Sequence, residues 1–285
     1  MSSMRLIGPH WRGIDATKHL VIFGDSYSAV GYDSLSPLPT IAKPMGVPFP
    51  GETYNEPDKP NWVGHLIATY FKDRTDVLIY DYARGGDRVF DIRRQAIQQF
   101  IPHLGKKPEF CPWTSSDTLF ITWVGINDCA YVGTEEGIQG LIDTLFGFQE
   151  QLYESKARNF LFVNVPPIDR SPATMRTGAM QEHPTIYEIW NMTLNRRAEA
   201  FVSSHPDATV MVFSAWDTFT HVLDDPSVCG FAPDSGRKAG GDIWFDHLHP
   251  TSAMHRILAD NIFQFLRYTR VGDAETKQGG ITNTQ

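Results

Sequence analysis

Residues 20–28 read Leu-Val-Ile-Phe-Gly-Asp-Ser-Tyr-Ser, an apolar run followed at once by a polar turn sequence. Such a short, continuously apolar run is typical of a strand that is buried on both faces, as the strands of parallel sheets are. Gly24, Asp25 and Ser26 are turn-forming residues. The stretch therefore predicts a buried strand over residues 20–23 that delivers Ser26 just beyond its carboxyl end.

Outward from this strand, strand-like and helix-like segments alternate along the chain. Further apolar, β-rich runs lie at residues 77–80, 119–124, 160–165 and 210–213. Apolar stripes at helical spacing lie at residues 92–101, 138–152, 185–202 and 254–266, and a capping box from Thr185 to Glu188 opens the third. This alternation predicts an α/β fold with a parallel five-stranded sheet covered by helices on both faces. We expect one domain over residues 1–271 and a polar tail over residues 272–285.

Composition disfavours several classes of protein. The 285 residues include 25 Lys and Arg against 33 Asp and Glu, a formal net charge of −8, which disfavours a nucleic-acid partner. No apolar run approaches the ~20 residues of a membrane span, and three scattered cysteines are too few for a disulfide framework. Residues 1–5 lack the apolar core of a secretion signal, so we expect either an intracellular protein or one whose signal has been removed.

Residues able to do chemistry follow three of the predicted strands and one late loop. Ser26 follows the first strand, Gly86 the second and Asn127 the third, whereas Asp246 and His249 precede the last predicted helix. Ligands of parallel sheets bind at the carboxyl ends of the strands, so these residues are expected to meet. Ser26 is then a candidate nucleophile, His249 its base and Asp246 the carboxylate that orients the base. The backbone N–H groups of Ser26 and Gly86 and the Asn127 amide are candidate oxyanion donors.

Other interpretations of these residues remain open at this stage. Taken singly, each motif can be a turn, a loop or a helix cap. Asp246, His247 and His249 are also metal-binding residue types, which makes a metal-dependent hydrolase an alternative. A non-catalytic sugar-binding protein on a hydrolase scaffold is another. The concurrence of four motifs at one end of the sheet favours the serine nucleophile. The segments 31–61 and 224–241, long and rich in Pro and Gly, are candidate lids or pocket walls.

The same motifs resemble the sequence blocks of the SGNH (GDSL-type) hydrolases in kind and in order. The blocks are Gly24-Asp25-Ser26, Gly86, Gly125-x-Asn127-Asp128 and Asp246-x-x-His249, and they span nearly the whole chain. The chain is most similar to the fungal acetylesterases of carbohydrate esterase family sixteen, through residues 23–28, 60–62, 125–128, 165–167, 170–172 and 248–250. The resemblance implies a three-layer α/β/α, flavodoxin-like fold. Asp81-Tyr82 departs from the Asn that many relatives carry before the second block, and the secretion signal usual in the fungal group is absent.

The resemblance also implies an activity, namely hydrolysis of short-chain, mainly acetyl, esters on carbohydrates such as acetylated oligosaccharides. It implies neither a metal nor an organic cofactor. A GDSL-type lipase or acylhydrolase acting on longer acyl esters is the alternative. Trp62, Trp123 and Trp244 flank the motifs, and these aromatic rings are expected either to stack on a sugar ring of the substrate or to pack in the core.

Overall fold

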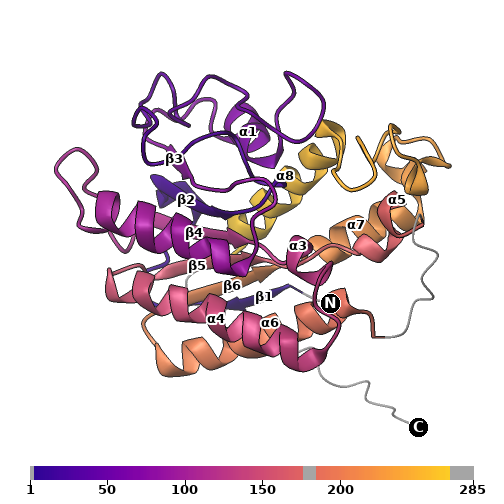
Figure 1. The fold of residues 1–285 in the computed structure, drawn as a ribbon. Coiled ribbons are helices and arrows are strands. Elements are labelled where there is room, and N and C mark those ends of the chain that lie inside the picture. The colour runs from indigo at the N-terminus through magenta and orange to yellow at the C-terminus, as the bar shows by residue number, and fades with distance from the viewer. Residues whose placement is uncertain (1–2, 176–183, 270–285) are drawn as a thin grey trace, which may run out of the picture.

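The computed structural model describes residues 3–175 and 184–269, and a six-stranded sheet forms its centre (Figure 1). The strand order is β1-β6-β5-β4-β2-β3, and every pairing is parallel except that of β1 with β6. The strands are β1 (Met4–Leu6), β2 (His19–Gly24), β3 (Leu78–Asp81), β4 (Thr118–Trp123), β5 (Asn159–Val163) and β6 (Thr209–Phe213). Without β1, this is the flavodoxin-like order 2-1-3-4-5.

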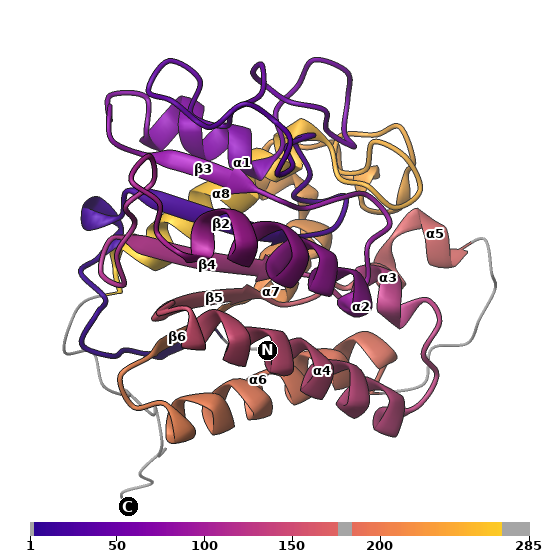
Figure 2. The same cartoon turned by 60° about the vertical axis from the view of Figure 1, so that its left-hand side comes forward.

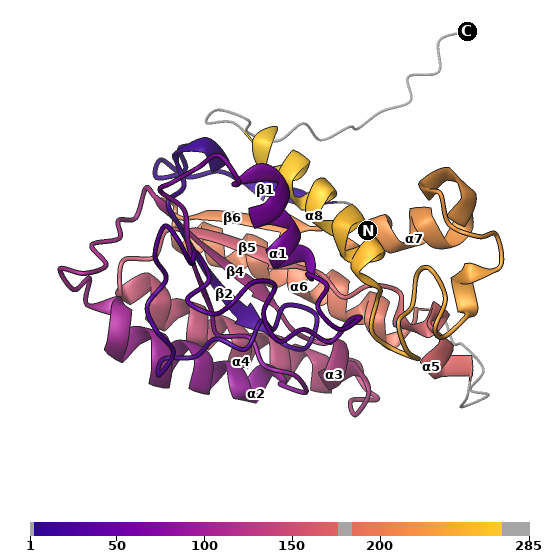
Figure 3. The same cartoon turned by 90° about the horizontal axis from the view of Figure 1, so that it is seen from above.

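Helices cover both faces of the sheet, which gives the three layers expected from the sequence (Figures 2 and 3). One layer comprises α2 (Val89–Ile92), its continuation η3 (Arg93–Gly105), α4 (Glu135–Glu154) and α6 (Ile186–Ser204). The other comprises α1 (Trp62–His65), η2 (Leu66–Tyr70), α7 (Ala215–Asp224) and α8 (Ser252–Arg267). Short helical segments complete the chain: η1 (Ile14–Ala16), α3 (Ile126–Cys129), η4 (Ile168–Arg170), α5 (Pro172–Met175), η5 (Pro226–Cys229) and η6 (Ser235–Arg237).

The predicted number of strands is wrong by one, because no sequence pattern marks β1. This strand has three half-buried residues and pairs antiparallel with β6, with Met4 opposite Val212 and Leu6 opposite Val210. A strand of this length carries too few residues for a period-two pattern, so its formation depends on the exposed edge of β6. The predicted tail over residues 272–285 lies outside the described residues.

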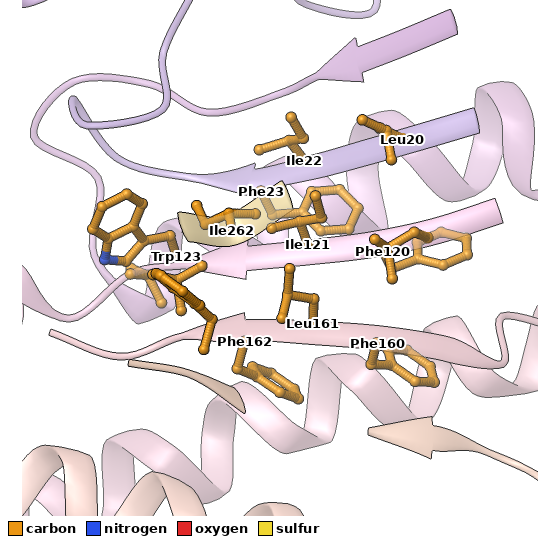
Figure 4. Packing of buried hydrophobic residues seen from close by; sticks show 14 of the residues in the cluster. Leu20, Ile22, Phe23, Phe120, Ile121, Trp123, Phe160, Leu161, Phe162 and Ile262 are labelled. Atoms are coloured by element: carbon orange, nitrogen blue, oxygen red, sulfur yellow. The ribbon is translucent and has the colours of Figure 1, made fainter. Parts of the chain in front are cut away.

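The continuous apolar runs are explained by the two helical layers, because both faces of each central strand are covered. On one face of β4, Trp123 packs edge-on against Tyr27 with ring centroids 5.4 Å apart. On the other face, Phe120 packs edge-on against Phe100 of η3, also at 5.4 Å. Figure 4 shows side chains of β2, β4 and β5 in this core together with Ile262 of α8. Such a sheet is rigid, so residues at its end are held in fixed positions.

The predicted capping box at the start of α6 is confirmed. The Thr185 hydroxyl accepts a hydrogen bond from Glu188 N at 3.3 Å, and the Glu188 carboxylate accepts one from Thr185 N at 2.7 Å. Among the helices of residues 3–175 and 184–269, none combines the length and apolar character needed to cross a membrane. The three cysteines are free in the structure.

Candidate active site

The carboxyl ends of β2 and β4 lie side by side and bring the predicted site residues to one edge of the sheet. Gly24 of β2 stands opposite Trp123 of β4, and the turns that follow carry Ser26 and Asn127. The loop before α8 returns to the same edge and brings His249 to Ser26, with Nε2 3.0 Å from Oγ. Proximity of residues so distant in the chain is created by the parallel topology alone.

Ser26, His249 and Asp246 form one chain of hydrogen-bonding groups. The Nδ1 atom of His249 lies 2.8 Å from Oδ2 of Asp246, on the side of the ring opposite Ser26. A carboxylate at Nδ1 selects the tautomer that carries its proton there, so that Nε2 is left as an acceptor for the Ser26 hydroxyl. The arrangement can therefore withdraw a proton from Oγ and hold the resulting imidazolium.

The loop that carries His249 is held by the carboxylate of Asp246 and by Tyr27, which lies in the turn after β2. Oδ1 of Asp246 accepts hydrogen bonds from the backbone N–H groups of Leu248 and His249, each at 2.7 Å. The Tyr27 hydroxyl donates to Leu248 O at 2.7 Å. Burial acts to raise the pKa of Asp246, but the hydrogen bonds from His249 and Leu248 outweigh it, and the pKa lies below its usual value. Asp246 thus stays charged, as an orienting partner of imidazole must.

The turn that presents Ser26 is fixed from inside the protein. Oδ1 of Asp25 accepts a hydrogen bond from Tyr27 N at 3.0 Å, the usual Asx-turn contact. The Gln95 side-chain amide pairs with the Gly24 backbone at two points, accepting from N and donating to O, each at 2.8 Å. Gln95 therefore holds the last residue of β2 as a neighbouring strand would. Sequence reasoning missed Gln95, because one amide among the residues of a helical stripe carries no distinguishing pattern.

The predicted oxyanion donors are the backbone N–H groups of Ser26 and Gly86 and the side-chain amide of Asn127. Gly86 has a φ of 81°, a conformation that favours glycine, and Asn127 lies in the first turn of α3. Within the described residues, no protein group accepts a hydrogen bond from the backbone N–H of Ser26 or of Gly86. The Asn127 amide donates one N–H to Asp87 O at 3.0 Å, which fixes the side chain and leaves its second N–H. These groups can stabilise a negatively charged oxygen next to Ser26.

The glycine before this asparagine is required by its surroundings. Gly125 has a φ of 124°, and a Cβ built there would overlap the ring of Trp190. A side chain at residue 125 would therefore displace the start of α3 and the Asn127 amide with it.

Buried carboxyl groups lie beneath the site. Asp25 is completely buried, its Oδ2 has no hydrogen-bond partner among the described residues, and burial raises its pKa to about 7. Burial raises the pKa of Asp128 to about 6, and its two oxygens accept from Val89 N at 3.1 and 3.2 Å. Asp128 thereby joins α3 to the start of α2. This contact runs next to the hydrogen bond from Asn127 to Asp87 O, which joins the same two segments. Both acids support the turns and do not reach the reacting atoms.

Of the two roles expected for three tryptophans, stacking on a sugar ring or packing in the core, the structure supports the second. Trp62, Trp123 and Trp244 are each 0% exposed, so their rings pack in the core and offer no face to a ligand. An exposed aromatic side chain that does lie beside His249 is Tyr54, which is 44% exposed and has its ring centroid 5.4 Å from that of His249. Tyr54 belongs to the long segment 31–61, and nothing in its local sequence distinguishes it from other tyrosines.

The structure separates the residues of the metal-site alternative. His247 is exposed, whereas both ring nitrogens of His249 face Asp246 and Ser26. In the part of the chain that the structure describes, no group of three or more His, Cys, Asp or Glu side chains is placed to hold a metal ion.

Ser26, His249 and Asp246 thus lie in hydrogen-bonding sequence at the carboxyl edge of a mostly parallel α/β sheet, an arrangement that serine hydrolases use. Comparison with known proteins specifies the family: residues 20–262 match the family model of GDSL-like lipase/acylhydrolase, and the chain belongs to this family. It is 30% identical over 270 residues to an acetylesterase of Thermothelomyces thermophilus, with 87% of each protein covered. The chain is thus a carboxylic ester hydrolase of the GDSL type.

Solved structures of lower sequence identity share the fold. An α/β hydrolase, LAE5, from the metagenome of Lake Arreo matches with a TM-score of 0.53 and 15% identity, covering 88% of this chain and 97% of that one. The esterase EstA of Pseudoalteromonas sp. matches with a TM-score of 0.51 and 12% identity, covering 87% of this chain and 98% of that one. These likenesses concern the architecture.

Proposed function

We propose that this chain is a serine esterase that hydrolyses short-chain, mainly acetyl, esters carried by carbohydrates. The observation that carries the proposal is the hydrogen-bonded sequence Ser26–His249–Asp246, with 3.0 and 2.8 Å between successive groups. A serine hydroxyl is a weak nucleophile until an adjacent base removes its proton, and this arrangement supplies both the base and its orienting carboxylate.

The reaction proceeds in two halves. Ser26 Oγ attacks the ester carbonyl carbon while His249 Nε2 takes the hydroxyl proton, and the carbonyl π electrons move onto the carbonyl oxygen. Collapse of the tetrahedral intermediate breaks the bond to the alcohol oxygen, which leaves with the proton from His249. Water then attacks the acyl-enzyme while His249 takes its proton. Collapse of the second tetrahedral intermediate breaks the bond to Ser26 Oγ, which receives that proton from His249, and the carboxylic acid is released. Asp246 holds the imidazole ring and stabilises its charged form throughout.

Charge that develops on the carbonyl oxygen is stabilised by three N–H groups. These are the backbone N–H of Ser26, that of Gly86 and the side-chain amide of Asn127. The donors are held before the substrate arrives, by the Gly86 backbone conformation and by the contact from Asn127 to Asp87 O. One such donor contributes about 2.7–4 kcal/mol at the transition state.

The acetyl and carbohydrate parts of the proposal rest on different support. The relative from Thermothelomyces thermophilus is named an acetylesterase, which supports a small acyl group. The carbohydrate alcohol is supported by the resemblance of the motifs to fungal acetylesterases of carbohydrate esterase family sixteen. The family name covers lipases as well, so longer acyl esters are the competing substrates.

A chain-length series tests the proposal. Rates on p-nitrophenyl acetate should exceed those on the octanoate by a wide margin, and acetylated xylo- or gluco-oligosaccharides should release acetate. Equal or rising activity with acyl length would assign the protein to the lipase-like members instead. Inhibition by a chelator together with resistance to fluorophosphonates would contradict the serine mechanism altogether.

A further inference from the structure

A polar cavity of about 530 Å³ lies beside the catalytic groups and has no role in the chemistry described above. Its walls come from the segment after β2, from residues 52–54, from the loop after β3 and from η3. The residues used below are Asp33, Glu52, Tyr54, Arg84, Arg94 and Gln99. These segments lie together above the β2–β3 end of the sheet in Figure 1. Ligand pockets of proteins commonly have volumes of about 300–1,000 Å³, so the cavity can hold a sugar-sized molecule.

Tyr54 connects the cavity with the reacting groups. Its ring lines the cavity and also lies 5.4 Å, between centroids, from the ring of His249. Gly85, the neighbour of Gly86, lines the cavity too. The Tyr54 hydroxyl packs directly against its Cα, where a side chain would otherwise be. Tyr54 is therefore a wall of the cavity that also contacts the imidazole, and Gly85 brings the cavity within one residue of Gly86.

The position of His249 decides which half of an ester lies on this side. The imidazole that takes the Ser26 proton must give it to the alcohol oxygen that leaves. The alcohol therefore lies next to the imidazole in the tetrahedral intermediate. Since Tyr54 contacts that ring and lines the cavity, the alcohol half is directed toward the cavity.

The walls of the cavity fit a neutral molecule with many hydroxyl groups. Asp33 and Glu52 supply acceptors, Arg84 supplies donors, and Gln99 supplies both. The remaining cation, Arg94, forms an ion pair with Asp87. Because Asp87 already balances Arg94, the remaining charges are those of Asp33 and Glu52 against Arg84, which disfavours an anionic alcohol and permits a neutral one. The rings of Tyr32 and Tyr82 add apolar area, against which the C–H faces of a sugar can pack.

We propose that this cavity is the alcohol subsite and binds the polyhydroxy alcohol, a sugar unit, that carries the acyl group. The inference rests on the proposed esterase function and adds to it the location and the residues of the leaving-group site. Glu52 and Gln99 hydrogen-bond the sugar hydroxyls there.

The test compares two acetyl esters that differ only in their alcohol. The measured quantity is kcat/KM for acetylated xylobiose divided by kcat/KM for p-nitrophenyl acetate, whose alcohol, p-nitrophenol, has a single hydroxyl group and is not a sugar. In Gln99→Ala this ratio should fall by about 3- to 10-fold, the effect of one hydrogen bond between neutral groups. In Glu52→Gln it should fall by about 10-fold or more, because a hydrogen bond to a charged acceptor is stronger. Gln98→Ala is the matched control, because Gln98 is the exposed neighbour of Gln99 on the same helix and does not line the cavity. Its ratio should equal that of the wild type.

An ester-free probe gives a second readout. Xylobiose should inhibit hydrolysis of p-nitrophenyl acetate competitively, with a higher inhibition constant in Gln99→Ala than in Gln98→Ala. Equal ratios and equal inhibition constants in these two variants would overturn the alcohol subsite while leaving the esterase proposal intact. Absence of Ser26-dependent hydrolysis of either acetyl ester by the wild type would instead overturn the proposed function.

Discussion

Tyr54 and Gly85 approach each other so closely that a Cβ built on Gly85 would overlap the Tyr54 hydroxyl oxygen. The same tyrosine has its ring 5.4 Å from that of His249. Tyr54 therefore reaches from Gly85 at its hydroxyl end to the His249 imidazole at its ring. The absence of a side chain at residue 85 permits this position. The backbone at Gly85 is not in the left-handed region, and the three atoms nearest to an alanine Cβ there all belong to the Tyr54 side chain.

We expect Gly85→Ala to displace Tyr54 and to lower kcat/KM for acetyl esters by up to about 10-fold, the equivalent of a lost aromatic contact. Tyr54→Ala should cost about as much, because both changes remove the ring from His249. The double variant should be no worse than either single one, a non-additivity that a double-mutant cycle measures. Additive losses would mean that Gly85→Ala acts through the backbone of Gly86 instead.

Ser26→Ala should abolish ester hydrolysis and leave the midpoint of thermal unfolding close to the wild-type value. The Ser26 hydroxyl has one hydrogen-bonding partner in the structure, His249, so its removal costs little stability. Peptide mapping of the wild type after fluorophosphonate treatment should locate the label on Ser26. Ser28 is the matched control, since its hydroxyl is buried and accepts from Trp62 Nε1 at 3.2 Å. A label on Ser28 would overturn the assignment of the nucleophile.

Asn127→Ala should lower kcat by about 10²- to 10³-fold with little change in KM, because an oxyanion donor acts mainly in the transition state. The same change removes the hydrogen bond to Asp87 O, so the free energy of unfolding should fall by about 0.5–1.5 kcal/mol. Steady-state kinetics and denaturant unfolding measure the two effects separately. A KM that rises while kcat stays unchanged would show that Asn127 binds the ground state instead.

The sheet was predictable from the sequence because its central strands are buried on both faces and appear as continuous apolar runs. The position of the site at the carboxyl edge was predictable as well. The apolar runs of β2 and β4 end where the polar motifs with Ser26 and Asn127 begin. β1 was not predictable, because three residues acquire strand geometry only when β6 offers them an edge.

The contacts that complete the site depend on tertiary structure and left no mark in the sequence. Gln95 is one polar residue in a helical stripe, and only the folded chain brings its amide to both backbone groups of Gly24. Tyr54 lies in a segment without regular structure, where no periodicity relates it to His249. The tryptophans show that closeness to a motif in the sequence does not put a side chain in the site. Trp62 and Trp123 adjoin motif residues in the chain, but their rings are buried in the core.

Asp25→Asn should make the unfolding temperature less dependent on pH. The pKa of Asp25 is raised from the ordinary 3.8 of an aspartate to about 7 in the folded protein, mainly by burial. Between these pH values the folded state binds more protons than the unfolded state. The stability linked to Asp25 is therefore full below about pH 4 and decreases as pH rises toward about 7, by up to about 1.4 kcal/mol per pH unit. Thermal unfolding from pH 4 to pH 8 should show the wild type losing more stability over this range than Asp25→Asn. Parallel curves would mean that Asp25 is ionised in the folded protein throughout.

The two histidines of the loop before α8 provide a test that separates serine chemistry from metal chemistry. His249 lies between Ser26 and Asp246, so His249→Ala removes the base and should lower kcat/KM by about 10⁴-fold or more. His247 is exposed and lies two residues before His249 in the chain, so His247→Ala is a matched control that should retain a rate close to that of the wild type. A metal site built on this loop would lose a ligand in either variant.

Metal analysis of the purified protein completes this comparison. Under the serine mechanism the two variants differ by orders of magnitude in rate, and neither rate responds to a chelator. Comparable losses in His247→Ala and His249→Ala, together with stoichiometric metal in the wild type and less in both variants, would replace the serine mechanism. The geometry favours the first outcome, because both ring nitrogens of His249 already lie within 3.0 Å of a carboxylate or hydroxyl oxygen, which leaves neither nitrogen available to a metal ion without breaking one of these contacts.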